Sequence, residues 1–397
     1  MAESELPIGR RVAQWRMRRR MSQQVFADRI GKSKSWVDKI ERGVRALDRF
    51  SVIEDIASVL RVDPVVLLGR DALPPAVAAD AKGVEGVRAA LALYNVPQTG
   101  QRAQPAPTPA GLARNVEHAW LTYQHARYPQ LLRMLPDLLD AARRARAQHG
   151  EPAGEMLVQV YRVTSSVLVK LGEADLAWLA ADRATATADP DPLLTAAATV
   201  SLGQALRALG RGRLAMTVTI AAAHRIAPPV PHDGPPDELS VLGTLLLQAA
   251  LAAAGCGDER SVHELIDQAA EIAEQVGDGY DHQWTNFGPT VVELARIAAA
   301  VDLGDAGDAV TRHEKVTSRE QWRRLPAEHR AAHLLDVARA YLQVGDLAGA
   351  GRVLVAADHT APAEIRRPAA RTVLAEVARG GAVPADVARL AAAVGVA

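Results

Sequence analysis

Residues 22–43 read SQQVFADRIGKSKSWVDKIERG, and this stretch decides the fold of the N-terminal part of the chain. Ser22 is a suitable N-cap for one short helix, and Gly31 is a suitable residue to end it. Ser33 can cap a second helix in the same way, and Gly43 ends that one. The stretch therefore predicts two short helices joined by a turn of about three residues.

The residues before and within this stretch predict three helices around one small core. Ile8, Val12 and Trp15 recur at helical spacing among arginines, which indicates an amphipathic helix over residues 8–21. The expected shared core consists of Phe26, Ile30, Val37 and Ile40, with the small Ala27 where two helices touch. Arg16 and Glu41 are well placed to pair between the first and third helices.

Residues 16–43 resemble the Cro/repressor, or Xre-type, helix-turn-helix family. With the closing helices expected at residues 50–60 and 62–68, the resemblance covers about residues 8–69. It implies a five-helix domain whose third helix, residues 34–42, lies in the major groove of double-stranded DNA.

The resemblance also implies which side chains contact DNA. Gln23 corresponds to a residue that binds a phosphate and braces the third helix. The candidate DNA-binding residues are Gln23, Lys34, Ser35, Trp36, Asp38, Lys39, Arg42, Arg45 and Arg49. Lysine can bind guanine O6 and N7, whereas Asp38 either accepts from cytosine N4 or excludes wrong sequences. Trp36 departs from the family pattern, and packing against the DNA backbone and packing against the first helix both remain open.

The charge of the chain is unevenly distributed. Residues 1–70 hold 15 Lys and Arg against 9 Asp and Glu, although the whole chain is neutral. A basic N-terminal part on an acidic remainder is expected when only the first part meets phosphate. A solvated basic surface is the alternative, and for Arg18, Arg19 and Arg20 solvation and phosphate contact are both open.

Three regions are predicted from the pattern of the whole sequence. Residues 1–70 form the helix-turn-helix domain, and residues 71–111 form a linker with a possible short helix near residues 84–94. The stretch 97–111, rich in Pro, Gln, Ala and Thr, favours an extended or flexible chain. Residues 112–397 form a helical repeat domain.

The helical repeat domain is predicted from a short glycine-containing sequence pattern that recurs along the chain. Glycines end one Ala-rich helix and precede the next at Gly172, Gly210, Gly255, Gly304 and Gly345, at intervals of 38 to 49 residues. These intervals resemble a degenerate tetratricopeptide-like array of helical hairpins. Stacked hairpins bury their apolar faces against one another, so the expected fold is an all-α solenoid with a concave surface.

A helix-turn-helix domain followed by a tetratricopeptide-like array is a layout found in bacterial regulators whose array binds a signalling peptide or another effector. Residues 280–289, YDHQWTNFGP, gather aromatic and amide side chains suited to a pocket wall, although Trp284 and Phe287 can equally fill a layer between hairpins. The candidate effector-binding residues are Tyr280, His282, Trp284, Asn286, Phe287, Tyr161, Arg162 and Trp178.

Several other classes of protein are disfavoured. The sequence has no phosphate-binding, dinucleotide-binding, nucleophile-elbow or HExxH motif, so we expect neither an enzyme nor a cofactor. One cysteine, Cys256, excludes an internal disulfide, and His329 and His333 lack the further ligands of a zinc site. We expect no membrane-spanning segment and a cytoplasmic location.

The sequence therefore predicts a DNA-binding transcriptional regulator that acts as a homodimer on a palindromic operator and senses a peptide or small-molecule effector. The alternative is a DNA-localised adaptor whose repeats recruit a protein partner.

Overall fold

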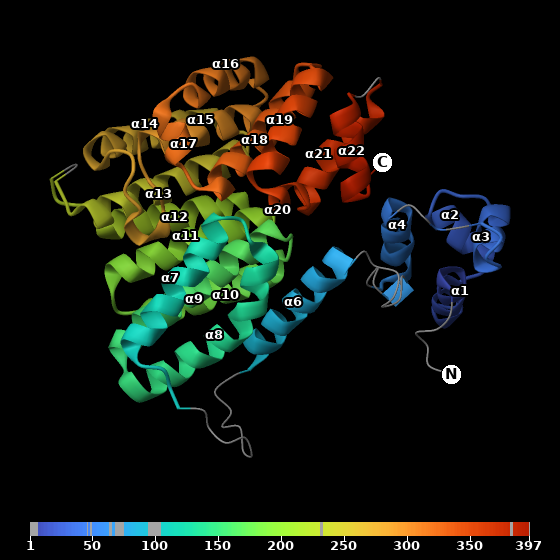
Figure 1. The fold of residues 1–397 in the computed structure, drawn as a ribbon, viewed down its shortest axis with the longest axis horizontal. Coiled ribbons are helices and arrows are strands. Elements are labelled where there is room, and N and C mark those ends of the chain that lie inside the picture. Colours follow the sequence, from blue (N-terminus) through green and yellow to red (C-terminus); the bar gives the residue numbers. More distant parts are fainter. Residues whose placement is uncertain are drawn as a thin grey trace. The chain divides into compact units, whose positions relative to one another are not determined.

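The computed structural model describes residues 7–45, 47, 50–62, 66–67, 75–93, 105–230, 233–381 and 384–396. The chain divides into two compact units, which we call the head (residues 1–83) and the body (residues 84–397). All regular elements in the described residues are helices (Figure 1). The predicted all-α class, with a helix-turn-helix unit followed by helical hairpins, is confirmed.

The head contains the helices that residues 8–60 predict. They are α1 (Ile8–Arg18), α2 (Gln23–Arg29), α3 (Lys34–Glu41) and α4 (Phe50–Leu60). The Ser22 hydroxyl accepts from the Val25 backbone N–H, and the Ser33 hydroxyl accepts from that of Trp36, each at 3.2 Å. Gly31 lies between α2 and α3 with a φ of +64°, a conformation that suits glycine. The two short helices and their turn thus follow from local sequence signals.

The core of the head forms where α1, α2, α3 and α4 meet. Val12, Phe26, Val37 and Ile56 are each at most 1 % exposed. Gly9 lets α1 approach the backbone of α3, because a Cβ atom at this position would lie only 1.9 Å from the Ile40 carbonyl oxygen. This close approach fixes α3 against α1.

Helix α6 (Pro75–Ala92) crosses from the first unit into the second. Its last two turns contribute Val84, Val87 and Leu91 to the main core of the body. This packing puts the contact boundary between Gly83 and Val84, whereas the sequence places boundaries at 70 and 111. The sequence-based boundaries remain a prediction.

The body is a series of antiparallel helical hairpins that follow one another in chain order (Figure 1). Its remaining helices are α7 (Pro109–Gln124), α8 (Tyr128–His149), α9 (Glu151–Lys170), α10 (Ala174–Ala188), α11 (Pro192–Ala208), α12 (Gly212–Ile226), α13 (Pro236–Ala254), α14 (Glu259–Val276), η2 (His282–Trp284), α15 (Pro289–Leu303), α16 (Ala306–Thr317), α17 (Glu320–Arg324), α18 (Ala327–Gln343), α19 (Leu347–Thr360), α20 (Pro362–Ile365), α21 (Pro368–Arg379) and α22 (Ala385–Val394).

Alternate helices of the hairpins form an inner row. Each of α7, α9, α11, α13, α15 and α18 contacts the next helix of this row as well as its own hairpin partner. Alanines on these helices keep the layers close; Ala197, Ala205, Ala249 and Ala338 are fully buried. Four of the predicted turn glycines, Gly172, Gly210, Gly304 and Gly345, have a positive φ between successive helices. Gly255 has a φ of −65°, and Gly257, two residues later, has the positive φ in that turn.

The inner row closes on itself, because α18 also contacts α7. The first helix of the row therefore meets its last helix, and the inner row surrounds a central, partly open space. Helix α13 is long and apolar enough to cross a membrane, but 83 % of its apolar window is buried inside the body. Such burial is typical of a core helix.

Candidate functional sites

Helix α3 is held from behind by a buried ion pair. The Arg16 guanidinium donates to both oxygens of Glu41, at 2.6 and 2.9 Å, and both side chains are largely buried. Gln23 donates from its side-chain nitrogen to the same carboxylate at 2.8 Å. A bidentate pair of this kind fixes orientation as well as distance. The end of α3 is therefore locked to α1 and α2, as the predicted Arg16–Glu41 pair requires.

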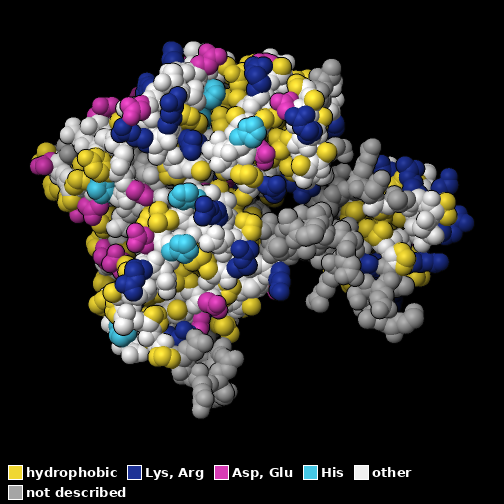
Figure 2. All heavy atoms as spheres, viewed as in Figure 1, with side chains coloured by type: hydrophobic (Ala, Val, Ile, Leu, Met, Phe, Trp, Pro, Cys, Tyr) yellow, Lys and Arg dark blue, Asp and Glu magenta, His cyan; other side chains and the backbone are white. Residues whose placement is uncertain are grey.

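The opposite face of α3 is open. Lys34, Ser35 and Lys39 are exposed, whereas Val37 and Ile40 point into the core. Arg42 is exposed too, and its guanidinium pairs with Asp38 at 2.6 Å. Figure 2 shows Lys and Arg side chains gathered along the edge of the head, over α2 and α3. The head thus presents one helix with a cationic and polar outer face.

The concave side of the body encloses a cavity of about 840 Å³. Side chains from α7, α9, α11, α13, α15 and α18 line it, and η2 contributes Trp284. Its charged lining side chains are Arg162, Lys170, Arg207, Arg367, Asp302, Glu328 and Asp336, with His329 and His333 beside them. The volume is of the order of known ligand pockets, and the wall combines apolar area with converging polar groups.

One side of the cavity is aromatic. The rings of Trp120 and Trp284 stack with centroids 5.7 Å apart and planes 6° apart. Arg162 lies 5.4 Å from the Trp120 ring and donates to the Gln159 side chain and to the Gln283 carbonyl. This arginine is only 2 % exposed, and burial lowers its pKa to about 10 while Asp281 acts in the opposite direction. The guanidinium is thus committed to holding the η2 segment against α9.

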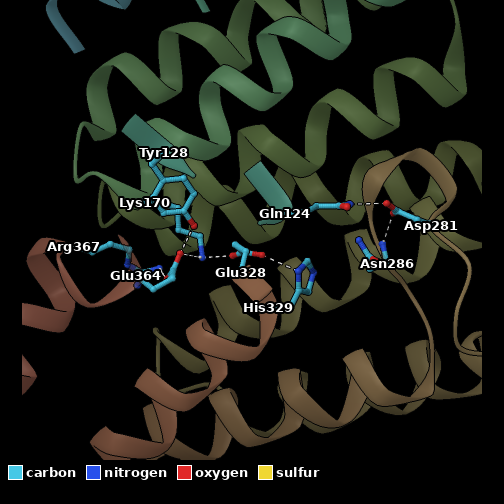
Figure 3. Close-up of polar contacts among 9 residues, drawn as sticks. All are labelled: Gln124, Tyr128, Lys170, Asp281, Asn286, Glu328, His329, Glu364 and Arg367. Carbon is cyan, nitrogen blue, oxygen red and sulfur yellow. Dashed lines mark hydrogen bonds and ion pairs between the residues drawn. The ribbon is translucent and has the colours of Figure 1, made fainter. Parts of the chain in front are cut away.

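On the other side, a polar network closes the inner row, and we call it the clasp: Tyr128, Lys170, Glu328, His329, Glu364 and Arg367 (Figure 3). The fully buried Glu364 accepts from the Tyr128 hydroxyl, from Arg367 at 2.6 Å and from Lys170 at 3.4 Å. These partners come from α8, α9 and the turn before α21, so one carboxylate joins early and late hairpins.

The second carboxylate of the clasp belongs to Glu328 at the start of α18. Burial alone would raise the pKa of Glu328, but its ion pairs with Lys170 and His329 outweigh burial and lower that pKa below its ordinary value. Burial beside Glu364 also raises the pKa of the Tyr128 hydroxyl, which stays neutral and donates. Glu328 is therefore ionised at neutral pH and pairs with Lys170.

Comparison with protein families assigns the head. Residues 7–68 match the model of a helix-turn-helix domain family. The head is a helix-turn-helix domain. No curated protein matches the sequence.

Six chains among the solved structures are similar to this chain, and two of them are as follows. One is PlcR of Bacillus thuringiensis, solved in complex with the peptide PapR7 and DNA, with 13 % identity and a TM-score of 0.35 over 69 % of this chain and 95 % of that one. The other is aspartyl phosphate phosphatase F of Bacillus subtilis, with 12 % identity and a TM-score of 0.42 over 91 % of this chain and 94 % of that one.

The structure brings most of the predicted DNA-binding residues of the helix-turn-helix domain to one side. Lys34, Ser35, Asp38 and Lys39 lie on α3, Arg42 is its C-cap residue, and Arg45 is exposed just after it. Trp36 is half-buried against the core of the domain, with Lys32 5.9 Å from its ring. Arg49 lies outside the described residues.

The arginines between α1 and α2 and at the end of α1 make different contacts. Arg19 donates to the carbonyls of Leu60 and Arg61 at 2.9 and 3.1 Å, and so ties α1 to the end of α4. Arg18 lies 4.9 Å from the Trp15 ring. Both side chains therefore make structural contacts within the domain.

Of the predicted effector-binding residues, Arg162 and Trp284 line the cavity. Phe287 is 1 % exposed and packs against α13, where a side chain on Gly243 would clash with its ring. Tyr280 is 62 % exposed and stacks on His282 outside the cavity. These placements give Phe287 the layer-filling role and leave Trp284 as the wall residue of the 280–289 segment.

Asn286, Tyr161 and Trp178 do not line the cavity. The Asn286 backbone N–H donates to Asp281 at 2.9 Å, which shapes the segment from within (Figure 3). Tyr161 is buried next to Arg143, and Trp178 is 44 % exposed on α10. Of the eight candidate residues, therefore, only Arg162 and Trp284 are part of the proposed effector site.

Sequence reasoning missed most of the cavity and all of the clasp. Lys170, Arg207, Glu328 and Glu364 lie on helices whose local patterns show only amphipathicity. His333 donates to or accepts from His313 at 3.0 Å, and in the described residues no group of three or more potential ligands is placed to hold a metal ion. A useful signal was available in retrospect: charged residues on otherwise Ala-rich inner helices.

Proposed function

We propose that this protein is a sequence-specific, DNA-binding transcriptional regulator whose body binds an effector. The observation that carries the proposal is the two-sided construction of α3. Its apolar side is buried and Glu41 is held by Arg16 and Gln23, while Lys34 and Lys39 face outward. A helix fixed in this way can enter a major groove with little loss of conformational entropy.

The chemistry of the outer face suits base contact. Each lysine can donate to guanine O6 and N7, and Ser35 can contact either a base or a phosphate. The Asp38–Arg42 pair offsets the repulsion that a lone carboxylate would meet beside phosphates. Gln23 braces α3 through Glu41, and Arg45 follows the helix as a backbone contact. Trp36 and Arg49 complete the proposed set.

We further propose that two copies bind a two-fold operator as a cytoplasmic, non-enzymatic homodimer. One helix-turn-helix unit covers one half-site, and dimers achieve specificity by spacing two such units along the duplex. An effector in the body cavity, beside Arg162 and Trp284, would change the equilibrium between dimer geometries and hence the match to the operator.

The proposal is tested by selecting duplexes from a randomised pool with the purified full chain. We expect one preferred sequence with two-fold symmetry and an affinity that falls steeply as salt rises. Lys39→Ala should relax the preference at one base pair, by about 1–3 kcal/mol of discrimination. Lys82→Ala, an exposed lysine on α6, is the matched control and should change nothing.

Unchanged selectivity in Lys39→Ala would refute the assignment of Lys39 as a base contact. A monomeric complex on an asymmetric site would refute the homodimer and leave the role of α3 intact. A body that binds no ligand and changes no DNA affinity would favour an adaptor that recruits a protein partner.

A further inference from the structure

The charges that line the body cavity are almost all neutralised by partners. Lys170 pairs with Glu328 and Glu364, and Arg367 pairs with Glu364. Asp302 and Asp336 both lie against Arg339, at 2.7 and 3.6 Å. These ion pairs leave two cationic side chains of the cavity without a carboxylate partner among the described residues: Arg162 and Arg207.

The two arginines differ in access. Arg162 is sealed at 2 % exposure, and its nitrogens hold Gln159 and the Gln283 carbonyl. Arg207 is only partly buried on α11 and has one hydrogen bond, from Nη1 to the Gln248 side-chain oxygen at 3.0 Å. Because a guanidinium has five N–H donors, this single bond orients Arg207 and leaves most of its donors available. Arg207 is therefore the accessible cation of the cavity.

Two further polar side chains of α11, those of Ser201 and Gln204, lie near Arg207 in the cavity. Ser201 and Gln204 precede Arg207 at intervals of three residues, so the three lie along one side of the helix, and all three line the cavity. Ser201 is 2 % exposed. In the described part of the chain, neither the Ser201 hydroxyl nor the Gln204 amide has a hydrogen-bond partner. The Ser201 hydroxyl and the Gln204 amide are therefore free to hydrogen-bond to a polar group of a ligand in the cavity.

Around Arg207 the described lining of the cavity holds charges of both signs, and no carboxylate among the described residues contacts the Arg207 guanidinium directly. Burial lowers the pKa of Arg207, and Asp302 and Asp336, which line the same cavity, act in the opposite direction. Both carboxylates share Arg339, which offsets one of their two charges, and burial raises the pKa of Asp336. An anion at Arg207 would thus gain a charge-assisted bidentate contact in a partly desolvated place.

We propose that Ser201, Gln204 and Arg207 of α11, with Gln248 as a brace, form a subsite that binds a carboxylate group of the effector. The inference rests on the proposed effector role of the cavity and narrows the ligand to a carboxylate-bearing molecule. Such a group is carried by the free C-terminus of a peptide and by a small carboxylic acid.

The test uses the purified full chain and three probes: a mixture of random hexapeptides with free C-termini, the same mixture as C-terminal amides, and a set of N-acetylated amino acids. Ligand retained after rapid gel filtration is quantified by mass spectrometry. We expect retention from the free-acid peptides or from the small acids and little from the amides. Retention of peptides identifies a C-terminal carboxylate, and retention of the small acids alone identifies a small effector.

Arg207→Gln should weaken binding of the retained ligand about 10- to 100-fold, as expected for the loss of a charge-assisted contact. Gln204→Leu should also weaken ligand binding, by a smaller factor. Thermal unfolding shows whether each variant folds, and if Arg207→Gln does not fold, Gln204→Leu provides the test. Arg213→Gln, an exposed arginine on α12, is the matched control.

Equal retention of amides and free acids, unchanged binding by both Arg207→Gln and Gln204→Leu, or no retention from any probe would overturn the proposal. The experiment distinguishes failure of the carboxylate-subsite proposal from failure of the proposed regulatory function. Equal retention of amides leaves an effector cavity without a carboxylate anchor, and DNA selectivity is measured separately, without ligand.

Discussion

The head and the body assemble their candidate sites in different ways. The candidate DNA contacts on α3 lie within one helix of eight residues, so their arrangement follows from helical spacing alone. The cavity of the body draws side chains from helices between Trp120 and Arg367, and it exists only because the inner row closes. A site on one helix is readable from sequence, whereas a site made by closure is not.

Both regions nevertheless use a buried carboxylate to fix their geometry. Glu41 ties α3 to α1 and α2 through Arg16 and Gln23. Glu364 ties the end of the array to its beginning through Tyr128 and Lys170. In the head the carboxylate orients a helix, and in the body it holds a ring closed.

The largest effect is expected at the clasp. Glu364→Gln should lower the free energy of unfolding of the body by about 3–5 kcal/mol, because Tyr128, Lys170 and Arg367 all lose the fully buried, charged carboxylate that joins them. Urea unfolding of the full chain, followed by circular dichroism, measures the change. Glu155→Gln, an exposed glutamate on α9, is the control, and equal midpoints for the two variants would show that the clasp does not hold the ring.

The corresponding change in the head should be smaller. Glu41→Gln should cost about 2–3 kcal/mol, since the Glu41 side chain keeps 7 % exposure, whereas that of Glu364 is fully buried. Faster hydrogen exchange in α3, but not in α13, would report the loss. Glu85→Gln, whose side chain is 72 % exposed, is the control. Unchanged exchange in α3 would mean that Gly9 and the apolar core suffice to hold the helix.

Lowering the pH should reduce the stability of the body more than that of the head. Burial, aided by His313, lowers the pKa of His333 to about 3 from its ordinary value of 6.5. Below pH 6.5 the unfolded chain gains a proton at His333 that the folded chain does not, so stability falls as pH falls. Between pH 6.5 and 5 the body should lose about 2 kcal/mol from this group.

Residues 1–83 contain no histidine, so the head lacks this contribution. Unfolding of the full chain at both pH values, with separate probes for α3 and α13, measures the difference. His333→Gln should reduce the acid sensitivity of the body, and the exposed His263→Gln should not. An identical pH dependence for His333→Gln and the native chain would contradict the assignment.

The smallest effect on stability is expected on the open face of α3. Asp38→Ala breaks an exposed ion pair with Arg42 and should cost less than about 0.5 kcal/mol. It should still change which sequences are selected from a randomised duplex pool, because Asp38 no longer excludes or accepts from a base. A variant with native stability and native sequence preference would remove Asp38 from the proposed contacts.

These contrasts show how far the sequence could predict the molecule. Ser22, Ser33 and Gly31 act on their own neighbours, and a glycine such as Gly304 ends its helix locally, so the helices and turns were predictable. The Arg16–Glu41 pair was predictable because it joins short adjacent helices. The Lys170–Glu364 contact depends on how many hairpins the array contains and how each one turns, which no local pattern specifies.

The same reasoning explains the 280–289 segment. Its composition indicated a special junction, and Trp284 does line the cavity. Composition did not distinguish Trp284 from Phe287, since the choice depends on Gly243 of α13 leaving room for the Phe287 ring. Arg207 gave no sequence signal, because its proposed role rests on the absence of a carboxylate partner among the described residues.

The most direct test of the account is methylation interference on the duplex selected by the full chain. Methyl groups on guanine N7 lie in the major groove, and those on adenine N3 lie in the minor groove. If α3 binds as proposed, N7 methylation at guanines within the site abolishes binding, and Lys39→Ala removes the effect at one of them. Binding that tolerates N7 methylation throughout the site and is blocked only by adenine N3 methylation would contradict it.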